Sequence, residues 1–311
     1  MHNDSEVFAV VGGGFGLYGY LPALIRIFGG RIVLHDKYRN VINSREELIQ
    51  FNEFIDWQPS IEDLLQKATG LVIAIPPSAQ FELVKKIAGL VNIKKLVLEK
   101  PLAPCPNSSA ELVEVVLSQS KKLRVGYTFV YTTWYPLLKA LMVQTTGELR
   151  IIWKFKANHI SIQKETWKRY HSLGGGVVRF YGIHLISVLA LLGFTNVIFS
   201  NLHQECNDQP TVWNAEFAGQ VVPKCEILVS IESDDDLFVI ESTDKAGNQM
   251  VYYSETTPFD SKTSSTNQDV RVPVLEKILR SFDDDDLGYA NHYSLTNDLW
   301  RKVEDCSVFR L

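Results

Sequence analysis

Five glycines lie within eight residues near the start of the chain, from Gly12 to Gly19. They directly follow the apolar run Val7–Val11, which has the length and the β-branched content of a strand buried on both faces. In such a turn the backbone can approach a pyrophosphate, because no Cβ blocks the contact and the free N–H groups at the start of the next helix attract an anion. The stretch therefore predicts a strand, a dinucleotide-binding turn and a helix.

The pattern G-x-G-x-x-G can be aligned with this turn in two ways. Gly14, Gly16 and Gly19 satisfy it literally, whereas counting from the end of the strand gives Gly12, Gly14 and then Leu17. We prefer the second alignment, because the first glycine should directly follow the strand, and Gly16 then comes one place early. A flexible surface loop is the alternative interpretation, since a lone glycine fingerprint is weak.

Asp36 supports the dinucleotide interpretation. It ends the apolar strand 31–35, about twenty residues beyond the glycines, where an acid accepts the adenosine ribose 2′-hydroxyl and repels a 2′-phosphate. Lys37 and Arg39 follow, and they could neutralise a phosphate if Asp36 turned outward. The sequence thus predicts NAD as the cofactor, with NADP possible.

Composition indicates a folded protein and excludes several classes of partner. The 311 residues suit two domains, and a net charge of -5 without a basic cluster makes nucleic acid an unexpected partner. Four cysteines stand far apart without paired spacing, which argues for free thiols and against a disulfide framework or a metal site. The polar start predicts no signal peptide, and no apolar run looks long enough to span a bilayer, so we expect a cytoplasmic protein without a membrane.

Short strands and helices alternate through the first part of the chain. Further strands are expected at 70–75, 95–98 and 123–127, and capping-box spacing at Ser44 with Glu47 and at Ser60 with Asp63 opens two helices. Repeated βα units cross over right-handedly and need helices on both faces, which predicts a doubly wound parallel sheet.

From residue 149 the pattern changes to strand-like alternation in hairpin order. This change predicts an α+β domain with a largely antiparallel open sheet. We place the boundary at the end of the βα series, with a dinucleotide-binding domain at 1–126 and a substrate-binding and oligomerisation domain at 127–311.

The run Glu99-Lys100-Pro101-Leu102-Ala103, directly after a strand, resembles the signature of the glucose-fructose oxidoreductase and inositol dehydrogenase family, called Gfo/Idh/MocA. V-V-G-G-G-F-G, A-I-P-P-S, V-G-Y and G-G-G-V-V-R-F-Y-G-I-H occur in the family's order, and together these motifs cover most of residues 6–193. The resemblance implies a Rossmann domain followed by an α+β domain whose open sheet packs between subunits. It therefore implies a homo-oligomer, either a dimer or a tetramer.

The resemblance also implies which residues form the site. The cofactor-binding residues would be Gly12, Gly14, Phe15, Gly16, Asp36, Pro76, Glu99 and Lys100. A lysine at the carboxyl end of a parallel strand lies beside the cofactor crevice, where burial makes deprotonation less costly, so Lys100 can exchange a hydroxyl proton. A solvated strand-end lysine is the alternative. By resemblance, the Lys100–Pro101 bond is cis.

His184 is the second catalytic candidate, on a helix that opens after Gly174–Gly176 and ends at Gly193. The family places a histidine here to help move the substrate's proton, and an aspartate one turn earlier. In this chain that aspartate is Phe180, and a frequent acid three residues after the histidine is Ser187. A phenyl ring can only pack against an imidazole, so a packed core histidine is the alternative.

Two functions of different classes follow. The first is an NAD-dependent oxidoreductase acting on a secondary hydroxyl, or the corresponding ketone, of a sugar, nucleotide sugar or cyclitol. Candidate substrate-binding residues are Tyr127, Tyr131, Trp167, Tyr170, His171, Phe180, Tyr181 and His184. The second is a catalytically weakened dinucleotide-binding sensor or partner protein, which is motivated by Phe180, Leu17 and Gln80, a frequent family histidine position.

Overall fold

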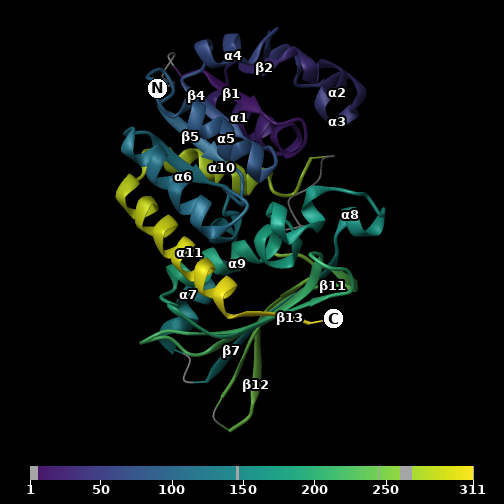
Figure 1. The fold of residues 1–311 in the computed structure, drawn as a ribbon, viewed down its shortest axis with the longest axis vertical. Helices are drawn as coiled ribbons and strands as arrows, with labels where there is room; N and C mark the ends of the chain where they lie inside the picture. The colour runs from purple at the N-terminus through teal and green to yellow at the C-terminus, as the bar shows by residue number, and fades with distance from the viewer. Residues whose placement is uncertain (1–5, 145–146, 245, 260–267, 311) are drawn as a thin grey trace. The chain divides into compact units, whose positions relative to one another are not determined.

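The computed structural model describes residues 6–144, 147–244, 246–259 and 268–310, which fold into two compact units (Figure 1). The first unit takes the described residues of 1–102, 111–128 and 261–290, and the second takes those of 103–110, 129–260 and 291–311. Each unit contains one β-sheet. The helices α6 (Pro106–Ser118) and α11 (Asp286–Cys306) contribute residues to both units.

The sheet of the first unit, sheet A, is parallel and has six strands in the order β3-β2-β1-β4-β5-β6. Its strands are β1 (Phe8–Val11), β2 (Ile32–His35), β3 (Ile55–Gln58), β4 (Gly70–Ile73), β5 (Lys95–Leu98) and β6 (Lys122–Val125). The central strands β1 and β4 are buried at every position, which is why their sequences are continuous apolar runs. The order is that of a dinucleotide-binding doubly wound sheet, so the predicted fold class is confirmed.

Helices connect these strands. They are α1 (Leu21–Phe28), α2 (Arg39–Ser44), α3 (Glu46–Ile49), α4 (Ile61–Lys67) and α5 (Pro77–Ile87), with a π-helical turn at Gly16–Tyr20 and 3-10 turns at Asp36–Tyr38, Asn52–Phe54 and Ser281–Asp283. Ser60 caps α4 as predicted, because its Oγ accepts the N–H of Asp63 at 3.0 Å. Ser44 does not cap a helix; it ends α2, and its hydroxyl donates to the carbonyl of Val41 at 3.2 Å.

The predicted boundary at 126/127 stays a prediction, and the described residues 268–290, which lie after it, group with the first unit. The helix α10 (Val272–Arg280) packs against α1, and the two helices lie side by side within the first unit. Val272, Leu275 and Ile278 form its buried face. This strongly amphipathic helix needs an apolar partner, and burial there stabilises the unit by about 1.5–3 kcal/mol for each fully buried side chain.

The sheet of the second unit, sheet B, has seven strands in the order β12-β11-β7-β10-β9-β8-β13. These are β7 (Glu148–Lys156), β8 (Asn196–Gln204), β9 (Pro210–Ala218), β10 (Cys225–Ser230), β11 (Glu232–Thr243), β12 (Gln249–Glu255) and β13 (Ser307–Arg310). The β10–β7 and β13–β8 pairs are parallel, and the other four pairs are antiparallel. This mixed sheet confirms the predicted α+β domain.

One face of sheet B carries the core of the second unit. Trp213, Ala215 and Phe217 alternate along β9 and are fully buried. The helices of this unit are α7 (Trp134–Gln144), α8 (Asn158–Ser161) and α9 (Ile183–Leu191), with a π-helical turn at Val177–Gly182 and 3-10 turns at Thr128–Tyr131, Trp167–Arg169 and His171–Leu173.

The helical stretch His171–Leu191 is long and apolar enough to cross a membrane. This corrects the expectation that the chain has no such run. However, 78% of its apolar window is buried within the protein, so packing in the core of the second unit accounts for its composition.

Candidate active site

The carboxyl ends of β1, β4 and β5 line up along one edge of sheet A. The N–H of Ala74 donates to the carbonyl of Val11 at 2.8 Å, and the N–H of Glu99 donates to the carbonyl of Ile73 at 2.9 Å. Between the neighbours β1 and β4 the strand order reverses, because β1 leads on to β2 and β4 leads on to β5. In open α/β sheets, ligands bind outside the strand ends at such a switch point.

The glycine turn occupies this switch point. Gly12 directly follows β1 with a φ of +149°, and a Cβ added there would lie 2.3 Å from the carbonyl oxygen of Ala74, so only glycine fits. At Gly14 no described atom lies within 4 Å of an added Cβ, which leaves room for a phosphate group to approach the backbone. The turn therefore fits the dinucleotide that the sequence predicts.

The irregular third glycine has a local explanation. A Cβ at Gly16 would lie 2.9 Å from Cγ1 of Val10, so Gly16 provides the close helix–strand packing that the third glycine of the fingerprint serves. The π-helical turn Gly16–Tyr20 places more residues in each turn than an α-helix does. It buries Leu17 completely. The geometry favours the alignment that begins at Gly12. In this alignment Leu17 is a buried core residue, and Gly16 takes the role of the third glycine.

Arg271 lies over the glycine turn, although it is far away in the sequence. Its guanidinium carbon is 4.1 Å from the ring centroid of Phe15 and 5.8 Å from that of Tyr18. Asp269 orients the guanidinium through an ion pair of 2.6 Å. Sequence reasoning missed both residues, because nothing in the local pattern around position 271 signals contact with a turn at the other end of the chain.

Asp36 lies at the end of β2 and is half-exposed. Its Oδ1 pairs with Arg39 at 2.8 Å, and the Arg39 guanidinium is 4.5 Å from the centroid of Trp57. The carboxylate is therefore accessible to a ribose hydroxyl. The same arginine is also close enough to attract a 2′-phosphate, as the sequence indicated.

Gln80 holds the loop that carries Lys100. Its fully buried Nε2 donates to the carbonyl oxygens of Glu99 and Leu102 at 2.7 and 3.1 Å. Lys100 stands between these two carbonyls, and the Lys100–Pro101 bond is cis, as the resemblance implied. The replacement of a frequent family histidine by Gln80 thus gives the loop a structural support.

Glu99 places a carboxyl group directly before Lys100. The hydroxyl of Tyr20 donates to its Oε1 at 2.7 Å. Desolvation raises the pKa of Glu99, while the positive charge of Lys100 and the hydrogen bond from Tyr20 oppose that rise. Glu99 and Lys100 therefore interact electrostatically at the ligand-binding edge of the sheet. Pro76 lies at the same edge, where β4 leads into α5.

Tyr127 belongs to the first unit and is almost fully buried, with 2% of its surface exposed. Burial raises the pKa of its phenol. A phenol is protonated at neutral pH in any case, and burial favours this neutral form further.

In the second unit, His184 is buried and stacks on Phe129 with ring centroids 4.6 Å apart. Ser187, where the family has a frequent acid, pairs its Oγ with Nε2 of His292 at 2.9 Å. Burial lowers the pKa of His292 to about 4, so this pair is a neutral internal contact. The ring stack fits a packed histidine, and a catalytic role for His184 stays a prediction.

Three of the candidate substrate residues form one aromatic cluster. Phe180 contacts Trp167 and Tyr181 with ring centroids 5.2 and 4.7 Å apart. The ammonium of Lys168 lies 4.9 Å from the Phe180 centroid. Phe180 therefore packs against two other residues that the sequence analysis named as candidates for substrate binding.

His171 is held in an ion-pair network. Glu304 accepts hydrogen bonds from Nε and Nη2 of Arg179 at 2.8 and 3.0 Å, and its Oε2 lies 2.9 Å from Nε2 of His171. Desolvation alone would raise the pKa of Glu304, but the bonds from His171 and Arg179 outweigh it and hold that pKa at about 2. The geometry favours a structural role for His171 over the predicted substrate contact.

The remaining candidates, Tyr170 and Tyr131, are half-buried in the second unit. The hydroxyl of Tyr170 donates to Glu165, and Tyr131 ends a 3-10 turn in a half-buried position. Within the described part of the chain no group of three His, Cys, Asp or Glu side chains could hold a metal ion, and all four cysteines are free thiols.

Comparison with known proteins agrees with this geometry. The family model described as the oxidoreductase family, NAD-binding Rossmann fold (GFO_IDH_MocA) matches residues 7–127. No curated protein is significantly similar to the sequence. Residues 7–127 thus match a family of NAD-binding oxidoreductases, and solved structures that share the fold include complexes with NAD and with NADP.

Solved structures share the fold of the whole chain. GenD2 from gentamicin A biosynthesis, in complex with NAD, has a TM-score of 0.72 at 14% identity, covering 98% of this chain and 96% of its own. KijD10, a 3-ketoreductase from Actinomadura kijaniata in complex with NADP and TDP-benzene, has a TM-score of 0.71 at 12% identity and covers 99% and 100%. The WlbA (WbpB) dehydrogenase from Thermus thermophilus, in complex with NAD and UDP-GlcNAcA, has a TM-score of 0.65 at 16% identity and covers 95% and 94%.

Proposed function

We propose that the protein is an NAD(P)-dependent oxidoreductase that interconverts a secondary hydroxyl and a ketone on a sugar, nucleotide sugar or cyclitol. One observation carries the proposal: the glycine turn and the Glu99–Lys100 loop lie together at the switch-point edge of sheet A, in a domain of an oxidoreductase family. Two structures with this fold are a 3-ketoreductase with TDP-benzene and a dehydrogenase with UDP-GlcNAcA. They support the substrate class.

The residues that would hold the dinucleotide all lie in the first unit. These are Gly12, Gly14, Phe15, Gly16, Asp36, Pro76, Glu99 and Lys100. The backbone of the turn would receive the pyrophosphate, and Asp36 the adenosine ribose. When bound, NAD(P) supplies the hydride chemistry.

Lys100 would handle the proton of the reacting oxygen. As a hydroxyl is oxidised, the neutral amine of Lys100 accepts its proton; as a ketone is reduced, the ammonium donates the proton back. Gln80 keeps the loop of Lys100 in place. By resemblance to the family, His184 would assist, and Tyr127 is a further candidate for substrate binding.

A screen of substrates tests the proposal. The purified protein is mixed with NAD or NADP and a panel of sugars, cyclitols and nucleotide sugars, and NAD(P)H absorbance is followed in both reaction directions. We expect steady turnover of at least one compound. Tight dinucleotide binding without turnover of any compound would instead favour the catalytically weakened sensor or partner protein.

NAD is expected to bind more tightly than NADP, by about tenfold or more, because the exposed Asp36 carboxylate accepts a ribose hydroxyl and repels a 2′-phosphate. Calorimetric titration with NADH and NADPH measures the ratio. Asp36→Asn should lower this ratio of NADH to NADPH affinity, because it removes the charge that repels the phosphate. Arg39→Ala should raise the ratio, because Arg39 is the group that would attract the phosphate. Clearly tighter NADPH binding by the parent protein would contradict the assignment.

His184→Asn is expected to slow turnover by less than about tenfold, far less than removal of Lys100. Phe180 cannot orient or charge the imidazole as the family's aspartate would, so Lys100 carries most of the proton transfer. Turnover of the parent, His184→Asn and Phe180→Asp on one substrate measures the division of roles. An equal, severe loss at His184 and Lys100 would show that His184 is essential without its carboxylate. Activity that appears only in Phe180→Asp would indicate a site inactivated by Phe180.

We also propose that the protein forms a homo-oligomer through sheet B. The edge strand β12 exposes Met250 and Val251, and β8 exposes Ile198, and exposed apolar groups of this kind mark interfaces. Light scattering should give twice or four times the mass of one chain. Met250→Asp should shift the protein toward monomer, whereas Val91→Asp, at an exposed position of the first unit, should not. A monomeric parent at micromolar concentration would contradict the proposal.

A further inference from the structure

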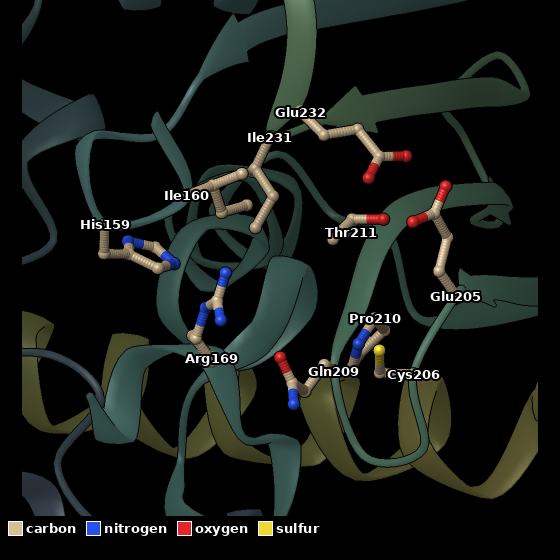
Figure 2. Close-up of a pocket in the computed structure, with 10 residues that line it drawn as sticks. All are labelled: His159, Ile160, Arg169, Glu205, Cys206, Gln209, Pro210, Thr211, Ile231 and Glu232. Carbon is tan, nitrogen blue, oxygen red and sulfur yellow. The ribbon is translucent and has the colours of Figure 1, made fainter. Parts of the chain in front are cut away.

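The second unit contains a cavity of about 150 Å³ between α8, the loop after β8 and the start of β11. At about 30 Å³ for each water, it has room for roughly five waters or one small ring. Ile160, Ile231 and Pro210 form apolar parts of its wall. Figure 2 shows that the polar ends of the other side chains gather around the same space. The functions assigned so far do not use this cavity.

His159 presents an unpartnered nitrogen to this space. The residue is 6% exposed, and its Nε2 has no hydrogen-bond partner within the described part of the chain. Its Nδ1 lies 3.4 Å from the hydroxyl of Tyr181. When that hydroxyl donates to Nδ1, the proton of the neutral ring is on Nε2, which can then donate to a ligand. Burial, with the positive charges of Lys168 and Arg169, lowers the pKa of His159 to about 4.

Donors and acceptors are segregated across the cavity. Figure 2 shows the imidazole of His159 and the guanidinium of Arg169 directed toward one another on one side. The carboxylates of Glu205 and Glu232 lie on the other side, and Gln209 lies below. A buried polar group such as the Nε2 of His159 is costly unless a ligand or water satisfies it. The cavity is therefore suited to a ligand that both accepts and donates hydrogen bonds.

The charges narrow the class of ligand. The lining carries two carboxylates and one guanidinium, and Lys168 adds a second positive charge near the neutral His159. These charges balance, so the cavity has no net positive charge to attract a phosphate or a carboxylate. A ring with several hydroxyls fits better, because its hydroxyls donate to Glu205 and Glu232 and accept from Arg169. Its C–H face can pack against Ile160 and Ile231.

We infer that this cavity binds a single polyhydroxylated ring, the sugar or cyclitol part of the substrate. The choice of a sugar rests on the proposed function. Tyr181 joins the cavity to the aromatic cluster, since it contacts both His159 and Phe180. The cavity therefore selects which ring the second unit accepts.

Alkylation of Cys206 tests the inference directly. Cys206 lines the cavity and is exposed, while Cys306 is also exposed but does not line the cavity. Mass spectrometry follows modification of both thiols by iodoacetamide, with myo-inositol, glucose, glucosamine, glucuronate or serine present. We expect at least one neutral ring to slow Cys206 modification threefold or more, saturably, with Cys306 unchanged. Protection by serine alone would overturn the inference in favour of a zwitterion site, and protection by glucuronate alone would overturn it in favour of an anion site. No protection by any compound would overturn it too.

Variants connect this protection to the named side chains. Glu205→Gln and Arg169→Gln should each raise the half-saturating concentration of the protecting ring about tenfold or more, because each removes a charge-assisted hydrogen bond. Glu255→Gln changes the same residue type at an exposed position of β12 outside the cavity. It should leave that concentration unchanged. Unaltered melting temperatures and NADH affinity confirm that the variants fold.

Failure of this inference and failure of the proposed function give different results. If a sugar protects Cys206 but no sugar is oxidised or reduced, the cavity assignment stands and the oxidoreductase proposal fails. If sugars are turned over with the same KM in the parent and Glu205→Gln, and none protects Cys206, the oxidoreductase proposal stands and the cavity assignment is wrong.

Discussion

Lys100→Ala is expected to lower turnover about 100-fold or more while leaving the affinity for NADH nearly unchanged. The reason lies in the arrangement of the loop. Lys100 stands at the carboxyl end of β5, next to Glu99, and the loop backbone is held by Gln80 at both flanking carbonyls. Truncation of the side chain removes the proton-exchanging group without moving the glycine turn. Steady-state kinetics on the best substrate of the panel, with calorimetry for NADH, measures both quantities.

Two further variants sharpen this experiment. Lys100→Arg keeps the positive charge, but a guanidinium does not release its proton near neutral pH, so turnover should fall nearly as far as in Lys100→Ala. Lys86→Ala removes an exposed lysine of α5 in the same unit and should change neither quantity. If Lys100→Arg retained full activity, positive charge alone would suffice, and the role of Lys100 in proton exchange would be wrong.

Glu304→Ala is expected to destabilise the second unit by about 3–5 kcal/mol, the usual effect of leaving a buried charge without its partner. Glu304 has only 16% of its side chain exposed, and Arg179 has 12%. Without the carboxylate, the guanidinium keeps, among the described residues, only the carbonyls of Pro104 and His171 as acceptors. Urea unfolding followed by tryptophan fluorescence measures the loss, since Trp300 donates to Glu304 at 2.8 Å and reports on this region.

The same helix offers a control. Asp298 pairs with Arg301 on α11, but both side chains are about half-exposed. Because water and salt screen such a pair, Asp298→Ala should cost no more than about 0.5 kcal/mol. If Glu304→Ala and Asp298→Ala lowered the free energy of unfolding equally, burial of the Arg179–Glu304 pair would add nothing to its effect on stability.

The Glu304 network also predicts a dependence on pH. The folded-state pKa of Glu304, about 2, is below its ordinary value of 4.5. Its contribution to stability is therefore complete above about pH 4.5 and is lost as the pH falls from there toward 2. The difference in unfolding free energy between the parent and Glu304→Gln should shrink over this interval. A difference that stays constant from pH 6 to pH 3 would contradict the assignment.

The sequence determined the fold class and the cofactor-binding edge of the protein. Strands at 8–11, 70–73 and 95–98 were predictable because a strand buried on both faces must be a continuous apolar run. The glycines were predictable because few residue types fit a turn whose backbone approaches a phosphate. Asp36 was predictable because few residue types at the end of a strand can accept a ribose hydroxyl. These properties depend on the chemistry of neighbouring residues along the chain. The functional assignment of Lys100 and the cis Lys100–Pro101 bond were predicted from the resemblance to the family.

Tertiary structure decided what local patterns leave open. Ser44 and Ser60 have the same capping spacing, yet only Ser60 caps a helix, because the chain around Ser44 is already helical. The strand β3, with its mixed burial, and the edge strand β13 were not predicted, since neither has a continuous apolar run.

Long-range contacts explain the remaining differences at the candidate site. Arg271 over Phe15, Gln80 under the Lys100 loop and Glu304 with Arg179 each join residues far apart in the chain. Gln80 departs from a family pattern, and its hydrogen bonds support the loop of Lys100. A single sequence carries the propensity of each residue for its local structure, but which distant charge or carbonyl satisfies a buried polar group is set only when the chain folds.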